Sequence, residues 1–315
     1  MLALSRGRRL AIGLLLLLSI NSAYLLLIHT DALPQQAITD IVWQLRLPRL
    51  LTAISVGAIL AVCGTAMQAQ FRNPLADPGL VGVAGGAGLG AAFAIALHSP
   101  AAVVAIAAFA GALGANVLAQ FLNQQQQPQS LLLAGVAINA LSGAILAVLF
   151  SLVSDPVLRS IQFWLLGSFA YTSLPQAVAL CSLSLVVGGY FLRRASSLNV
   201  LLLGAAQAYA LGLDVKREQQ RLNLVVACGV GGAVAMTGMV GFIGLMVPHI
   251  LRRCGIGHHR QLIPLAALAG AGLALAADSV AQYSAPPLDL PVGAMTSLAG
   301  APFFLYLLRQ QQRPC

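Results

Sequence analysis

Residues 47–69 read LPRLLTAISVGAILAVCGTAMQA, a stretch of 23 residues in which Arg49 is the only charged side chain. At 1.5 Å per residue a helix of this length measures about 34 Å, enough to cross the roughly 30 Å hydrocarbon core of a bilayer. The apolar residues follow one another without the alternation that is typical of a half-buried strand. The stretch therefore predicts a membrane-spanning helix.

Runs of the same kind recur along the chain, and the composition agrees with them. Of the 315 residues 59% are hydrophobic and only 8% are charged, too few charges to cover a surface that faces water. Lipid offers the backbone no hydrogen-bond partner, so only helices or closed barrels satisfy it, and long apolar runs favour helices. We predict an all-α polytopic membrane protein, a single transmembrane domain over residues 1–315. Its ten predicted spans are 10–28, 47–69, 79–97, 101–122, 130–153, 173–192, 222–239, 241–254, 261–281 and 291–308.

The basic residues predict the orientation of these spans. Cytoplasmic loops of membrane proteins carry an excess of Lys and Arg. If the N-terminus is cytoplasmic, all of the 17 basic residues except Arg46, Arg49 and Arg159 fall on the inner side. This asymmetry predicts that both termini are cytoplasmic. The run over 10–28 is longer than the apolar core of a secretory signal, so we interpret it as a retained first span.

Two parts of the chain show a weak internal similarity. Residues 46–68 begin RLPRLL and continue through VGAILAVCG, and residues 221–248 begin RLNLVV and continue through VGGAVAMTG. In the predicted topology the first copy starts outside and the second inside, the pattern of an inverted repeat. Repeats of this kind place the solute route at their interface, and chance similarity of composition is the alternative.

The longest inner segment, 193–222, contains two predicted short helices. Leu198 to Gly212 reads as an alanine-rich amphipathic helix, and Asp214 is placed to cap a second helix. Both are too short and too polar to span the membrane. Two interpretations are open: a helix lying on the bilayer surface, or a docking surface whose small side chains fit the groove of a cytoplasmic partner.

The sequence contains no residues that point to chemistry or to an energy source of its own. Lys216, the only lysine, is not part of a GxxxxGK[ST] phosphate loop, so no ATPase domain is predicted. Asp278 is the one clear acid within a span; it suits a proton-coupled carrier poorly, and capping or local pairing is the alternative. Cys254, His258 and His259 are too few for a metal site. We predict no catalytic residue, no cofactor, no metal site and no nucleic-acid partner.

Several stretches together resemble the permease subunits of the iron-siderophore, haem and cobalamin ABC importers. They are RLPR at 46–49, RNPLADPGLVGVAGGAG at 72–88, LLLAGVA at 131–137, FWLLGSF at 163–169, LGLDV at 211–215, GFIGLMVPHILRRCG at 241–255, HHR at 258–260 and LPVGAMTSLAGAPFFLYLL at 290–308. The resemblance covers most of the chain, from Arg46 to Arg309, and any one motif alone is not specific.

The resemblance implies a type II importer permease of the bacterial inner membrane. It implies a homodimer that works with two cytoplasmic ATPase subunits and a periplasmic binding protein. The expected solute is an iron chelate, with a ferric siderophore favoured and with haem or cobalamin as alternatives. A secondary carrier that works without ATP is the alternative from a different functional class.

The resemblance also implies a coupling-helix segment at 195–221 that the ATPase grips. Its expected contact residues are Leu203, Gly204, Ala205, Ala206, Ala208, Leu211 and Gly212. Many relatives carry acids just after this glycine, where alanines stand here, so packing rather than charge supports the assignment. At the outer rim, Arg46 and Arg49 match positions that dock the binding protein; snorkelling of these side chains to the interface is the alternative.

The same resemblance places the predicted spans 130–153 and 291–308 of each copy along a central translocation path. Its expected residues are Asn139, Met295, Thr296 and Ser297, a wall with few charges that lets a bulky solute slide through. An inner gate is expected at Gly85 and Gly86, in a loop over 82–88, together with Gln129 and Ser130 just before the 130–153 span.

Overall fold

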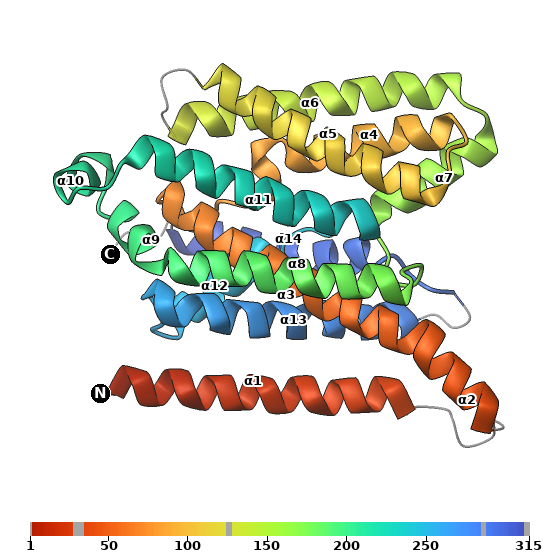
Figure 1. The fold of residues 1–315 in the computed structure, drawn as a ribbon, viewed down its shortest axis with the longest axis horizontal. Coiled ribbons are helices and arrows are strands. Elements are labelled where there is room, and N and C mark those ends of the chain that lie inside the picture. The colour runs from red at the N-terminus through yellow and green to blue at the C-terminus, as the bar shows by residue number, and fades with distance from the viewer. Residues whose placement is uncertain (1, 28–34, 124–127, 285–287, 312–315) are drawn as a thin grey trace.

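The computed structural model describes residues 2–27, 35–123, 128–284 and 288–311, and the regular elements of these residues are all helices (Figure 1). In chain order they are α1 (Leu2–Leu27), α2 (Gln35–Ile41), the π-helix η1 (Val42–Arg46), α3 (Leu47–Gln70), the 3₁₀-helix η2 (Pro78–Val81), α4 (Val83–Ala96), α5 (Ala101–Leu122), α6 (Pro128–Leu152), α7 (Asp155–Leu166), α8 (Leu174–Arg193), α9 (Ala195–Leu201), α10 (Ala205–Ala210), α11 (Val215–Thr237), α12 (Ile243–Arg253), α13 (His259–Tyr283) and α14 (Val292–Gln311). The all-α prediction is confirmed.

Each predicted span coincides with one helix, namely α1, α3, α4, α5, α6, α8, α11, α12, α13 or α14. Within the described residues, five helices are by themselves long and apolar enough to cross a membrane: α3 with the helix that leads into it, α5, α6, α8 and α13. Two further apolar helices, α4 and α14, are shorter. The membrane fold is therefore supported, and the count of ten spans and the inverted repeat stay predictions.

The centre of the bundle is α3, the helix from which the sequence argument started. Nearly all of its residues from Pro48 to Gln70 are buried, and it packs against α13, α8 and α12. The chain enters α3 through the wider π-turn η1, just before Pro48. A proline ring clashes with the carbonyl four residues earlier in a regular helix, and the wider turn relieves that clash.

Two local predictions differ from the structure. Residues 82–88 do not form a loop: Asp77 caps η2 by accepting a hydrogen bond from the Gly79 N–H at 2.8 Å, and α4 begins at Val83. The true loop is therefore residues 71–77. The helix α7 was not predicted at all; it is short and amphipathic, with Ile161 buried and Phe163 70% exposed.

Candidate functional site

The coupling segment, residues 195–221, lies at the end of the bundle where both described ends of the chain also lie (Figure 1). The predicted single helix over 198–212 is wrong, because the chain breaks into α9 and α10 at Gly204. The φ of +105° at this residue is readily adopted only by glycine. Asp214 caps the following helix, as predicted, by accepting a hydrogen bond from the Arg217 N–H at 3.1 Å. That helix is α11 itself, which continues into the bundle.

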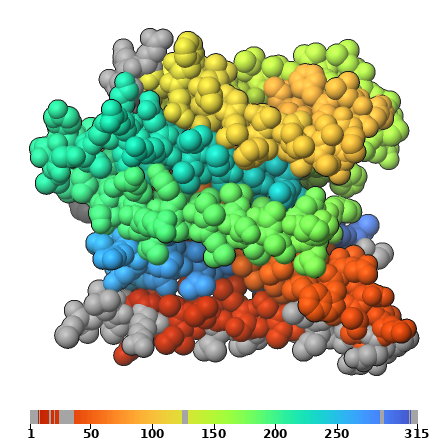
Figure 2. All heavy atoms as spheres, in the orientation of Figure 1, coloured from red at the N-terminus to blue at the C-terminus, as the bar shows by residue number. Residues whose placement is uncertain are grey.

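The outer surface of α10 and its flanks carries small alanines together with larger apolar side chains, and it protrudes from the body of the protein (Figure 2). The exposed predicted contact residues are Leu203, Ala205, Ala206, Leu211 and Gly212, whereas Ala208 is fully buried. Tyr209 is 78% exposed and adds an aromatic ring to this surface. Large apolar side chains exposed on a polar end of a protein indicate a surface that a partner covers.

The side chain of Asn199 hydrogen-bonds this segment to α13, in addition to the packing of α9 against α3 and α13. The Oδ1 of Asn199, on α9, accepts a hydrogen bond from the His259 N–H at 3.1 Å and lies 2.7 Å from His259 Nδ1. Its Nδ2 lies 3.1 Å from His258 Nε2. His259 is fully buried at the start of α13. We call this arrangement the Asn199 joint; it links α9 to the start of α13.

The loop 71–77 lies beside the coupling segment. A Cβ atom added to Gly204 would stand 3.0 Å from Arg72 Nη1, which places the arginine head against the start of α10. The coupling segment therefore touches the loop that leads to η2 and α4.

In the same loop, burial raises the pKa of the Asp77 carboxyl, and the hydrogen bond from Gly79 partly offsets this effect.

The predicted gate residues fall into two groups. Asn139, on α6, accepts a hydrogen bond from the Gly85 N–H and donates one to the Gly79 carbonyl, both at 3.1 Å. Gly86 packs directly against α5, since a Cβ atom there would stand 2.3 Å from the Gly111 carbonyl oxygen. This first group is thus a packed contact among η2, α4, α5 and α6.

The second group, Gln129 and Ser130, lies in the first turn of α6, with Gln129 exposed. These residues are nine or ten positions before Asn139, which corresponds to about 14 Å along the helix. The structure therefore does not bring the two groups into one cluster.

The predicted path residues on α14 turn mostly inward. Thr296 is 4% exposed, and its hydroxyl donates to the Gly293 carbonyl at 3.0 Å, as does that of Ser297 at 2.7 Å. Met295 is partly buried against the main core. Among the exposed side chains of α14 are Leu298 and Leu305, 68% and 64% exposed, which the sequence reasoning did not single out.

Arg49 organises the predicted outer rim, at the end of the bundle opposite the coupling segment (Figure 1). Its guanidinium donates to the carboxylate of Asp278 at 2.8 to 3.1 Å and to that of Asp289 at 2.8 and 2.9 Å. Asp278, on α13, is 1% exposed and also accepts a hydrogen bond from Gln282, whereas Asp289, just before α14, is 36% exposed. We call this arrangement the Arg49 joint. It ties α3, α13 and the start of α14 together, and it shows that Asp278 pairs across the bundle with Arg49 as well as locally with Gln282.

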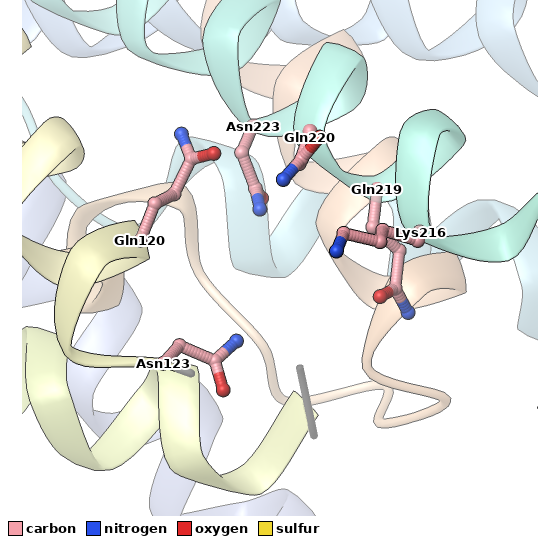
Figure 3. Close-up of a pocket in the computed structure, with 6 residues that line it drawn as sticks. All are labelled: Gln120, Asn123, Lys216, Gln219, Gln220 and Asn223. Atoms are coloured by element: carbon pink, nitrogen blue, oxygen red, sulfur yellow. The ribbon is translucent and has the colours of Figure 1, made fainter. Parts of the chain in front are cut away.

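The cavities differ in size and character. A polar pocket of about 30 Å³ lies between the end of α5 and the start of α11, lined by Gln120, Asn123, Lys216, Gln219, Gln220 and Asn223 (Figure 3). It has room for one or two water molecules and none for a chelate. An apolar cavity of about 430 Å³ lies between α12, α13 and α14, and both Met295 and Thr296 line it.

Comparison with known proteins accounts for this combination of an exposed coupling segment and a packed helical bundle. Residues 10–310 match the FecCD transport family, which is nearly the whole chain. The chain belongs to the FecCD transport family.

Relatives of this FecCD permease support the match along the full length. It is 40% identical to the hemin transport system permease protein HmuU of Yersinia pestis over 313 residues, 95% of this chain and 94% of the relative. It is 41% identical to the vitamin B12 import system permease protein BtuC of Salmonella typhi over 278 residues, 86% and 84% of the two chains. A metal-chelate type ABC transporter in an inward-facing conformation superposes with a TM-score of 0.90 at 30% identity, over 96% of this chain and 99% of that one.

Membership defines the general role of the FecCD permease. Permeases of this family are the membrane-spanning subunits of ABC importers, and their ATPase is a separate subunit. The protein is accordingly a multi-pass inner-membrane permease that pairs as a dimer and works with ATPase subunits and a binding protein.

Proposed function

We propose that this permease carries an iron chelate, a ferric siderophore first, across the bacterial inner membrane at the expense of ATP hydrolysed by two partner subunits. The observation that carries the proposal is the coupling segment: an exposed, small-sided α10 on a rigid base. The Asn199 joint connects that base to α13, so force applied at α10 reaches the bundle. Residues 1–315 form one permease domain, with 195–221 as its cytoplasmic coupling part.

The orientation in this proposal follows from the basic residues. The end that carries α10 also carries Arg193, Arg194, Arg252 and Arg253. Cytoplasmic ends of membrane proteins are enriched in such residues, so this end faces the cytoplasm and both termini with it.

The dimer in this proposal forms along α6 and α14, where the central path runs. α6 exposes a row of small residues, namely Ala137, Ala140, Gly143, Ala144 and Ala147, and a Cβ atom on Gly143 would have no neighbour within 4 Å. Small residues let helices approach closely in lipid, where tight packing drives association. On α14, Leu298 and Leu305 are exposed as well and are proposed to join this interface.

At the outer rim we propose that Arg46 and Arg49 contact carboxylates of the binding protein. The guanidinium of Arg49 is already shared by two acids of the same chain, and its side chain is 16% exposed. A binding-protein acid that reaches Arg49 competes with the exposed Asp289 rather than with the buried Asp278. Docking then loosens the start of α14 while α3 and α13 stay tied, and charge at this rim steers the encounter.

Haem is the second candidate solute, because the similarity to the hemin permease extends over 95% of the chain. The predicted path residues carry no charge that selects among chelates, so selection rests with the binding protein. The test is uptake of a radiolabelled ferric siderophore, haem and cobalamin by proteoliposomes that contain the permease, its ATPase and each candidate binding protein. Uptake of the ferric siderophore alone supports the proposal, and uptake of haem or cobalamin alone replaces the solute.

The coupling role has its own test, in the substitution Ala206→Trp on the exposed face of α10. A large side chain there blocks the fit into the ATPase groove, so we expect loss of ATP-driven uptake with the fold kept. Ala102→Trp, at an exposed position in the first turn of α5, is the matched control and should leave uptake unchanged. Full uptake by Ala206→Trp would show that α10 is not the docking helix.

A further inference from the structure

The first helix leaves an apolar cavity of about 740 Å³ between itself and the bundle. Along one side of the molecule, α1 lies next to α13 (Figure 1). The cavity is lined by Leu10, Leu14, Leu18 and Asn21 of α1, by Val247, Ile250, Leu251 and Cys254 of α12, and by Ala269, Gly272, Leu273, Leu275, Ala276 and Ser279 of α13. Almost all of this lining is hydrocarbon, within the part of the chain that crosses the membrane.

The length of the cavity matches one leaflet of a bilayer. From Leu10 to Asn21 the helix advances about 16 Å, and half of a 30 Å hydrocarbon core is about 15 Å. The deep end is polar, because Ser279 Oγ lies 3.4 Å from the amide oxygen of Asn21. A hydrocarbon chain that enters from the other end therefore meets a polar stop near the bilayer midplane.

Two arginines are sequence neighbours of residues that line the shallow end of the cavity. Arg9 directly precedes Leu10, and Arg253 directly precedes Cys254; Arg9, Arg253 and Cys254 are all exposed. Phosphate groups of lipids bind such basic clusters at the cytoplasmic face of membrane helices. The charge and the depth together describe one kind of occupant.

We propose that this cavity binds an anionic phospholipid of the inner leaflet, with one acyl chain between α1 and α12–α13 and its phosphate against the arginines. Such a lipid seals the seam between α1 and the bundle. The choice of leaflet rests on the proposed cytoplasmic orientation; lipid binding itself depends on neither the solute nor the ATPase, so its test is separate from theirs.

The test measures phospholipid retained by the purified permease after exchange into equal amounts of phosphatidylglycerol and phosphatidylcholine, by native mass spectrometry. The double variant Gly272→Leu, Ala276→Phe fills the cavity, since a Cβ atom on Gly272 has its nearest neighbour, Leu18 Cδ2, at 3.9 Å. We expect this variant to lose the retained lipid. The double variant Gly188→Leu, Ala179→Phe adds the same groups to open positions on α8 and should keep it. Equal retention by both variants would overturn the site.

The headgroup part of the proposal is tested by Arg9→Gln and Arg253→Gln. Each should reduce the preference for phosphatidylglycerol over phosphatidylcholine about fivefold, the typical contribution of one arginine near an anionic lipid. The control Arg159→Gln, at an exposed position on α7, should leave the preference unchanged. An unchanged preference in both test variants would contradict recognition of an anionic headgroup by these arginines and would leave only the acyl chain in the cavity.

Discussion

The two ends of this permease are fastened in different ways. At the end with the coupling segment, the Asn199 joint uses an amide, two imidazoles and a backbone N–H. At the outer rim, the Arg49 joint uses one cation shared by two carboxylates. Neutral hydrogen bonds keep their geometry at any salt concentration, whereas an exposed ion pair weakens with salt and yields to a competing charge. The difference suits an inner end that transmits force and an outer end that a docking partner can open.

The strongest way to break this comparison is Arg49→Ala. It leaves the buried Asp278 carboxylate with Gln282 but without its cation, and breaking one side of a buried ion pair typically costs about 3–5 kcal/mol in the free energy of unfolding. Thermal or denaturant unfolding of the purified permease measures the loss. Arg159→Ala, at an exposed position, should change stability by about 0.5 kcal/mol or less.

A second variant shows whether the pairing itself explains that loss. Adding Asp278→Asn to Arg49→Ala removes the unpaired charge, so most of the lost stability should return. If the stability losses of Arg49→Ala alone and Asp278→Asn alone simply add in the double variant, the pairing is contradicted.

The next largest effect is expected from Asn199→Ala at the inner end. His259 then loses its partner inside the protein, which typically costs about 1–3 kcal/mol. Because α9 is no longer tied to α13, we also expect solute uptake per ATP hydrolysed to fall while ATP hydrolysis continues. Asn199→Asp keeps the oxygen that faces His259 and should retain more of the coupling than alanine does. Unchanged uptake per ATP in Asn199→Ala would remove the Asn199 joint from the coupling route.

A smaller effect sharpens the outer half of the comparison. Asp289→Asn weakens only the exposed partner of Arg49, a contribution of about 0.2–1 kcal/mol that added salt should abolish. With Arg49 freed on its outer side, binding-protein affinity at low salt should rise. Asp40→Asn, at an exposed position on α2, serves as the control. A fall in affinity would show that Asp289 itself contacts the binding protein.

The smallest effect concerns Asp77, beside the coupling segment. Its pKa is raised in the folded state, so the folded protein binds this proton more tightly than the unfolded chain does. Stability is therefore lost as the pH rises from the ordinary range of a carboxyl group through the raised value. Asp77→Asn keeps an acceptor for the Gly79 N–H and stays neutral. It should unfold at a higher temperature than the natural protein at neutral pH, with the difference vanishing in acid; a difference independent of pH would rule out this titration.

The bundle could be predicted because lipid imposes simple rules of length and composition on each helix. Helix-start signals could also have predicted α7, since Ser154 followed by Asp155 and Pro156 is a typical helix start. The break at Gly204 was missed because the alanines around it favour one continuous helix.

The joints could not be predicted, because each of them is a contact across the chain. Arg49 was singled out by its motif, yet its buried partner lies 229 residues away. Asn199 carries no motif, and only the fold brings it to His258 and His259. For the same reason the burial of Thr296 was not predicted. The helical repeat of the sequence does not tell which face of α14 packs against the bundle.

The most direct test uses a cysteine at Tyr209→Cys, on the exposed tip of the coupling segment, in a chain whose exposed Cys254 and whose Cys315 are replaced by serine. A membrane-impermeant maleimide is applied to right-side-out and inside-out vesicles, with and without the partner ATPase. We predict labelling in inside-out vesicles only, and protection of the cysteine when the ATPase is bound. Labelling from the outer side, or equal labelling with and without the ATPase, would contradict a permease that takes its energy through α10.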